Sequence, residues 1–131
     1  MNTNIYRTVS DLKGFSLKNC PSMPEPAGVL MCAPDHFDVV DVKNPFMSGQ
    51  VGTVNRILAR KQWEDLRAAF EAVGKPVSLI GAVPGFEDMV FSANQTLVGL
   101  TPKMERVCLL GQMRHSSRRR EVPAFEAWFL K

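Results

Sequence analysis

A cluster of basic side chains near the C-terminal end is the first feature of the sequence that could do chemistry. It comprises one histidine and four arginines, namely Arg114, His115, Arg118, Arg119 and Arg120. Such a cluster can bind phosphate or nucleic acid. Glu121 interrupts it directly, and no glycine-rich or aromatic RNA-binding signature flanks it. The residue types alone therefore predict a solvated loop, and a basic nucleic-acid-binding domain stays open as an alternative.

Sulfur and imidazole groups are the second possible source of chemistry. The three cysteines, Cys20, Cys32 and Cys108, are odd in number and scattered, which argues against a disulfide framework and for a reducing cytoplasm. Cys32 and His36 have the spacing of half a metal site. A zinc site needs three or four ligands, and the other histidine, His115, is far along the chain. We therefore expect a buried thiol in a strand, a loop histidine, and neither a metal nor another cofactor.

The overall composition limits the class of protein. The chain has 131 residues, is 45% hydrophobic and 22% charged, and carries a net charge of +3. These values are typical of a soluble globular protein, and the length fits one domain. Apolar runs such as residues 107–110 are too short to span a bilayer, and residues 1–10 lack the apolar core of a secretory signal. The composition excludes disordered and fibrous classes.

An α/β pattern must position the chemically active side chains. Residues 1–27 are expected to form an irregular leader, because its prolines fix φ and remove backbone donors. A long loop is expected at 35–52. Short apolar runs predict strands at residues 29–32, 77–80, 89–91, 96–98 and 106–110.

Two helices are expected between and after these strands. Apolar residues at three- and four-residue steps predict a helix over residues 53–73, and Gly74 suits the left-handed position that follows a helix. A second apolar stripe that contains Phe125 and Trp128 predicts a helix that opens near Glu121 and runs to the last residue. Glu121 would suit the start of that helix, because an acidic side chain there complements the helix dipole.

Three stretches resemble a known family. Residues 31–39 and 44–47 read MCAPDHFDV and NPFM, residues 84–94 read PGFEDMVFSAN, and residues 114–121 read RHSSRRRE. Together they resemble the amidinotransferase and dimethylarginine dimethylaminohydrolase-like family of guanidine-modifying enzymes. The resemblance covers residues 28–131. It implies a pentein, an α/β-propeller of five ββαβ-type units, of which this chain would contain roughly the first two as an N-terminal portion.

The resemblance also implies a reaction. Family members attack a guanidinium or ureido carbon with a cysteine thiolate and expel an amine. Water or an acceptor amine then resolves the covalent intermediate. The catalytic cysteine and histidine are expected in later units, beyond residue 131. Cys32 and Cys108 lie in apolar strands, where burial makes a thiol inert. We therefore expect no hydrolytic activity from residues 1–131 alone, and unpaired strand edges that favour self-association or a need for the missing C-terminal portion.

Substrate-binding residues follow from the same resemblance. Asp88 matches the family's guanidinium-binding aspartate, and Arg118 matches the arginine that grips the substrate's α-carboxylate. Dimethylarginine dimethylaminohydrolases have a Glu-Asp pair where this chain has Ala93 and Asn94. The site would then carry less negative charge and would suit a ureido group or a less substituted guanidine. Without the family, Asp88 and Asn94 would both be interpreted as turn residues.

Two aromatic residues complete the expected substrate-binding set. Phe91 lies in the second motif and Phe46 in the first, although Phe91 would also suit the core and Phe46 a packed loop. Arg119 and Arg120 are expected to be solvated.

Three functional hypotheses remain open at this point. The first is the substrate-binding front of a cysteine-dependent hydrolase or amidinotransferase that acts on guanidino or ureido compounds such as arginine derivatives or citrulline. The second is a non-catalytic module that binds or senses an arginine- or citrulline-type amino acid. The third is the nucleic-acid-binding domain mentioned above.

Overall fold

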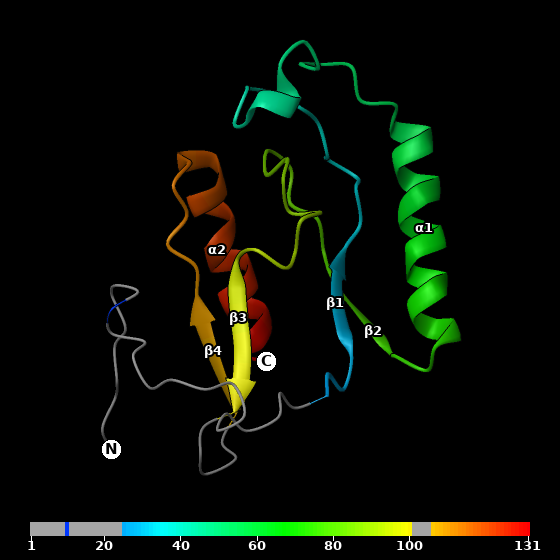
Figure 1. The fold of residues 1–131 in the computed structure, drawn as a ribbon, viewed down its shortest axis with the longest axis vertical. Coiled ribbons are helices and arrows are strands. Elements are labelled where there is room, and N and C mark those ends of the chain that lie inside the picture. The colour runs from blue at the N-terminus through cyan, green and yellow to red at the C-terminus, as the bar shows by residue number, and fades with distance from the viewer. Residues whose placement is uncertain (1–9, 11–24, 101–105) are drawn as a thin grey trace.

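The computed structural model describes residues 10, 25–100 and 106–131, and these form an α/β arrangement (Figure 1). Two short parallel strands, β1 (Val29–Cys32) and β2 (Val77–Ile80), are connected through the helix α1 (Arg56–Ala72). A hairpin of antiparallel strands follows, formed by β3 (Thr96–Leu100) and β4 (Arg106–Leu110). The helix α2 (Ser116–Phe129) ends the described chain.

The strand registers determine which loops meet. Val29 pairs with Val77 and Cys32 with Ile80, so β1 and β2 end at the same edge. Figure 1 shows the loop after β1, the turns after β2 and the first turn of α2 gathered at that end of the molecule. The carboxyl ends of parallel strands are where ligand sites commonly form in α/β folds.

The core joins β1, β2, the turns after β2 and one face of α2. Cys32, Ile80, Met89 and Phe125 are buried against one another. Trp128 packs on this cluster, and its indole Nε1 donates a hydrogen bond to the carbonyl of Leu79 at 3.2 Å. This attachment fixes α2, and with it the residues of its first two turns, relative to the parallel strands.

Most predicted strands are confirmed, and one is wrong. Strands at 29–32, 77–80 and 106–110 have the expected bounds, and the strand expected at 96–98 extends to Leu100. The strand expected at 89–91 does not form, because this stretch folds into consecutive turns. The amide of Phe91 donates to the carbonyl of Asp88, and that of Asn94 donates to the carbonyl of Phe91. Local backbone bonds thus replace strand pairing.

Both predicted helices exist, with corrected starts. α1 begins at Arg56 because the Asn55 side chain accepts a hydrogen bond from the amide of Leu58 and caps the helix. Gly74 follows with a φ of 73°, as expected. α2 begins at Ser116, so residues 118–120 are helical instead of forming the expected loop. Arginine favours helix, which the interpretation as a solvated loop overlooked.

Apolar side chains remain exposed on the hairpin and on α1. On the hairpin the exposed fractions are 68% for Leu97 and 62% for Leu109, and on α1 Ile57 is 86% exposed. The leader expected at 1–27, including Cys20, lies almost entirely outside the described residues. Within the described residues, which also include a short 3-10 helix at Pro45–Met47, no helix is both long and apolar enough to cross a membrane.

Candidate functional site

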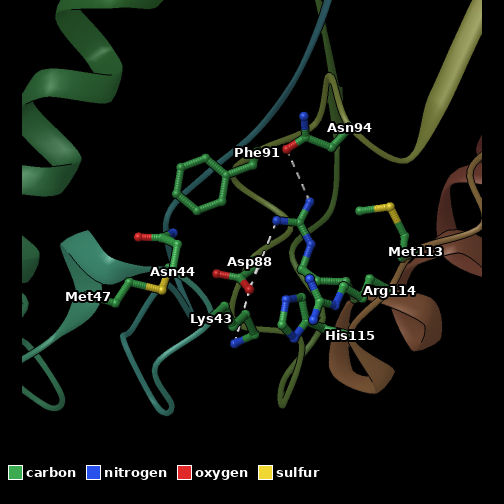
Figure 2. Close-up of a pocket in the computed structure, with 10 residues that line it drawn as sticks. Lys43, Asn44, Met47, Asp88, Phe91, Asn94, Met113, Arg114 and His115 are labelled. Atoms are coloured by element: carbon green, nitrogen blue, oxygen red, sulfur yellow. Dashed lines mark hydrogen bonds and ion pairs between the residues drawn. The ribbon is translucent and has the colours of Figure 1, made fainter.

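A cavity of about 320 Å³ lies at the end of the fold where these loops meet (Figure 2). Three segments line it: the loop after β1, the turns after β2, and the approach to α2 with its first turn. These segments are the same three stretches that carry the family resemblance. The lining residues are Lys43, Asn44, Met47, Asp88, Phe91, Asn94, Met113, Arg114, His115 and Arg118.

Asp88 is the buried carboxylate of this cavity, with an exposed fraction of 1%. Its Oδ2 lies 3.2 Å from Lys43 Nζ and 3.9 Å from a terminal nitrogen of Arg118, both ion-pair contacts. Neither carboxylate oxygen accepts a hydrogen bond of good geometry from the described residues. Asp88 therefore has acceptor capacity that no described side chain satisfies.

Arg118 brings the other expected site residues together. Its terminal nitrogen Nη2 donates to the side-chain oxygen of Asn94 at 3.4 Å, and its guanidinium lies 5.7 Å from the ring centroid of Phe91. Its Nε lies 3.1 Å from Glu121 Oε2. Asp88, Asn94, Phe91 and Arg118 thus meet in one cavity. Phe46, the fifth expected residue, does not line it and is 91% exposed.

Lys43 is a site residue that the sequence reasoning missed. Its side chain is only 7% exposed, and its ammonium contacts Asp41, Glu87 at 3.0 Å and Asp88. Burial lowers the pKa of Lys43, but hydrogen bonds to these three carboxylates outweigh it and raise the pKa above its ordinary value. The sequence signal that could have predicted a buried cation is the adjacent acidic pair Glu87-Asp88, because two buried carboxylates need a cation beside them.

Glu121 was also misinterpreted. It lies in the second turn of α2, not at its start, and is fully buried. Its carboxylate accepts hydrogen bonds from the backbone amide of Asp88 at 3.0 Å and from Gln95 Nε2 at 2.7 Å. Burial raises the pKa of Glu121, while Gln95, Arg118 and the Asp88 amide act in the opposite direction. Glu121 therefore holds the Asp88 turn and Arg118 in place from behind the cavity.

The remaining sequence expectations concern cysteine, histidine and the outer arginines. Cys32 is fully buried, and burial, with smaller contributions from Asp35 and Glu121, raises its pKa to about 11. The thiol is therefore unreactive at neutral pH, as expected. Arg119 and Arg120 are exposed, although Arg119 also donates to backbone carbonyls of the approach to α2.

Metal binding finds no support at Cys32 and His36. Within residues 25–100 and 106–131, no group of three or more His, Cys, Asp or Glu side chains is arranged to hold a metal ion.

The sequence and structure are similar to those of arginine-modifying enzymes. The chain is 36% identical over 107 residues to the bifunctional arginine dihydrolase/ornithine cyclodeaminase ArgZ of Synechocystis sp., which covers 82% of this chain and 14% of ArgZ. It is 29% identical over 98 residues to the N(G),N(G)-dimethylarginine dimethylaminohydrolase of Mycobacterium tuberculosis, covering 75% of this chain and 30% of that enzyme. No family model matches the chain.

A solved structure adds a likeness in three dimensions. The N-terminal domain of ArgZ, described as an arginine dihydrolase and crystallised as a cysteine-to-serine variant bound to substrate, superposes with a TM-score of 0.70 and 37% sequence identity. The match covers 77% of this chain and 35% of the ArgZ domain. The chain thus spans about a third of the domain that it resembles.

Proposed function

Because the chain belongs to the amidinotransferase and dimethylarginine dimethylaminohydrolase-like family, as an N-terminal portion, we propose that it forms the substrate-binding part of a guanidine-modifying enzyme. The enzyme would be a cysteine-dependent hydrolase or amidinotransferase that acts on non-peptide C–N bonds of guanidino or ureido compounds. ArgZ and the mycobacterial dimethylaminohydrolase act on arginine or its derivatives by their names, and the cavity of this chain would take a ligand of the same class.

The observation that carries the proposal is the meeting of complementary groups in one cavity. Asp88 offers a buried acceptor, Asn94 an amide oxygen, and Phe91 an aromatic face beside them. Planar groups rich in N–H donors are held by such acceptors and stack on such faces. Arg118 lies beside these three residues, and its guanidinium suits the α-carboxylate of an amino acid. The four side chains therefore offer both acceptors for a planar N–H donor and a cation for a carboxylate, the two kinds of group that an arginine-like molecule carries.

The larger architecture is part of the same proposal. Residues 28–131 would form roughly the first two of five ββαβ-type units of a pentein propeller. The exposed apolar residues of the β3–β4 hairpin support this assignment, because a neighbouring unit would cover them. A cytoplasmic location is proposed as well, since Cys32 and Cys108 are free thiols.

Catalysis by this chain alone is not part of the proposal. Cys32 is fully buried with a raised pKa, and burial also raises the pKa of Cys108. Neither thiol lines the cavity. The nucleophile would therefore come from elsewhere in the family's domain. A second candidate is a non-catalytic module that binds an arginine- or citrulline-type amino acid in the same cavity.

Ligand titration tests the proposal. L-Arginine and L-citrulline are titrated into the chain, with binding followed by amide chemical shifts and by calorimetry. Asp88→Asn removes the buried charge, so we expect affinity to fall by about tenfold or more, as for other charge-assisted hydrogen bonds. Asp65→Asn is the matched control, because Asp65 is an exposed carboxylate on α1 that pairs with Lys61.

Two outcomes would contradict the proposal. Absence of binding of either amino acid to the native chain would remove the substrate-binding role. Equal affinity of Asp88→Asn and the native chain would remove the cavity as the site. A parallel assay for ureido product or ammonia tests whether the chain alone is inactive, because appreciable turnover would refute that claim.

A further inference from the structure

The approach to α2, residues 111–115, forms one side of the cavity. Figure 1 shows this segment running beside the first turns of α2. The side chains of Met113, Arg114 and His115 line the cavity, and Figure 2 shows them together on one side of it. The conformation of the approach therefore determines where this side of the cavity lies.

The approach lies outside the helices and strands, and it is held at both ends. At its start the amide of Gly111 donates to the carbonyl of Gln95 at 2.7 Å. A Cβ atom on Gly111 would lie only 3.1 Å from the carbonyl oxygens of Asn94 and Gln95, so this end is packed closely against the turn that carries Asn94. At its other end the carbonyl of His115 accepts from the amide of Arg119 at 3.0 Å. The residues between these two ends need a separate support.

The side chain of Arg119 supplies that support. Its Nη1 donates to the carbonyl of Arg114 at 3.0 Å and to that of Met113 at 3.3 Å. Because this nitrogen of a guanidinium carries two N–H groups, it can donate to two consecutive carbonyls at once. Hydrogen bonds from a charged donor are stronger than those from a neutral one. Arg119 thus connects α2 directly to the backbone of two residues that line the cavity.

The stability of α2 does not account for an arginine at this position. Arg119 lies in the first turn of α2, which contains no acidic residue and has no side-chain cap at His115. A cation in the first turn is disfavoured by the helix dipole, and alanine has the higher helix propensity. The favourable contacts that the structure shows for this side chain are therefore its bonds to the approach.

We propose that Arg119 is a positioning residue that orders the approach and so presents Met113, Arg114 and His115 to the ligand. This inference rests on the proposed function, because it takes the cavity to be the amino-acid site. Arg119 does not line the cavity and acts only through the backbone that it holds. Without it, ligand binding would have to order the approach, and that cost would lower the affinity.

The experiment titrates L-arginine into the native chain and three variants. Arg119→Ala should weaken binding by about three- to tenfold, because a mobile segment must then be ordered on binding. Its urea midpoint of unfolding should stay unchanged or rise. Arg120→Ala is the matched control, since it removes the same charge from the next, exposed position of α2, and it should keep the native affinity. Arg119→Lys keeps a charged donor and should recover part of the lost affinity.

Methionine methyl signals test the ordering without any ligand. In the free chain labelled with 13C at its methionine methyl groups, Arg119→Ala should shift and broaden the signal of Met113. The signals of Met47, on the opposite loop, and of Met89, buried in the core, should stay in place. A general loss of structure would move all three signals.

The outcomes separate the two levels of the argument. If L-arginine binds neither the native chain nor any variant, the proposed function fails, and the methyl signals alone decide whether Arg119 orders the approach. If Arg119→Ala binds L-arginine as tightly as Arg120→Ala does, the inference is overturned while the proposed function stands. The same holds if the Met113 signal does not change. A fall in the urea midpoint of Arg119→Ala beyond that of Arg120→Ala would show a merely structural role and would also overturn it.

Discussion

Replacing Glu121 with alanine should destabilise the chain severely. The carboxylate accepts hydrogen bonds from the Asp88 amide and from Gln95 Nε2, and it lies 3.1 Å from Arg118 Nε. Alanine would leave two buried donors and one buried cation without their acceptor. An unsatisfied buried donor costs about 1–3 kcal/mol, and breaking a buried ion pair costs about 3–5 kcal/mol. Because these terms overlap at one site, we expect a total loss of about 3–5 kcal/mol.

Urea unfolding followed by circular dichroism measures this loss. Domains of this kind are stable by only about 5–15 kcal/mol, so Glu121→Ala should lower the midpoint markedly or prevent folding. Glu121→Gln should cost less, because the partnerless Oε1 of Gln95 could turn to accept from the new amide. Glu126→Ala, an exposed acidic residue on the same helix, is the control and should change stability by no more than about 0.5 kcal/mol. A loss below about 1 kcal/mol for Glu121→Ala would refute the role assigned to the buried network.

Two further predictions concern pH and association. The folded pKa of Glu87 is lowered, so its contribution to stability is present above the ordinary glutamate pKa and is lost as pH falls through the lowered value. Stability measured by urea unfolding should therefore fall between about pH 5 and 3 in the native chain and fall less in Lys43→Met, and parallel curves would contradict the pairing. The exposed Leu97 and Leu109 on the β3–β4 hairpin should make the chain self-associate. Sedimentation over a concentration series should show this, and Leu97→Lys with Leu109→Lys should reduce it; a native chain that stays monomeric throughout would contradict it.

Strands β1, β2 and β4 were predictable because the sequence signal for each is local. Apolar runs bounded by proline or glycine predicted β1, β2 and β4 with their observed bounds. The turn that carries Asp88 was not predictable in this way, because Met89, Val90 and Phe91 resemble a strand. Besides its local backbone bonds, this turn is held by the hydrogen bond from the Asp88 amide to Glu121, a contact across 33 residues of sequence. A local pattern carries no information about such a partner.

The same reasoning explains which site residues were found. Asp88, Asn94, Phe91 and Arg118 belong to motifs that the family resemblance identifies, and the structure brings all four to one cavity. The buried charges that support them were missed, because charged side chains are exposed by default and burial depends on tertiary partners.

Arg118 and Lys43, the two buried cations of the cavity, differ in how readily their contacts can be exchanged. Arg118 Nε contacts Glu121 at 3.1 Å, whereas its outer nitrogens reach Asn94 at 3.4 Å and Asp88 at 3.9 Å. Because the outer contacts are the longer ones, a ligand carboxylate could replace them while the Glu121 contact is kept. Lys43 is held by three carboxylates and cannot leave Asp88 without stranding a buried charge. Under the proposed function, the pair of Lys43 and Asp88 is therefore fixed, whereas the outer contacts of Arg118 can be exchanged for a ligand carboxylate. Because Lys43 and Arg118 both contact Asp88 Oδ2, substitutions at the two residues should change affinity non-additively, and a double-mutant cycle measures their coupling.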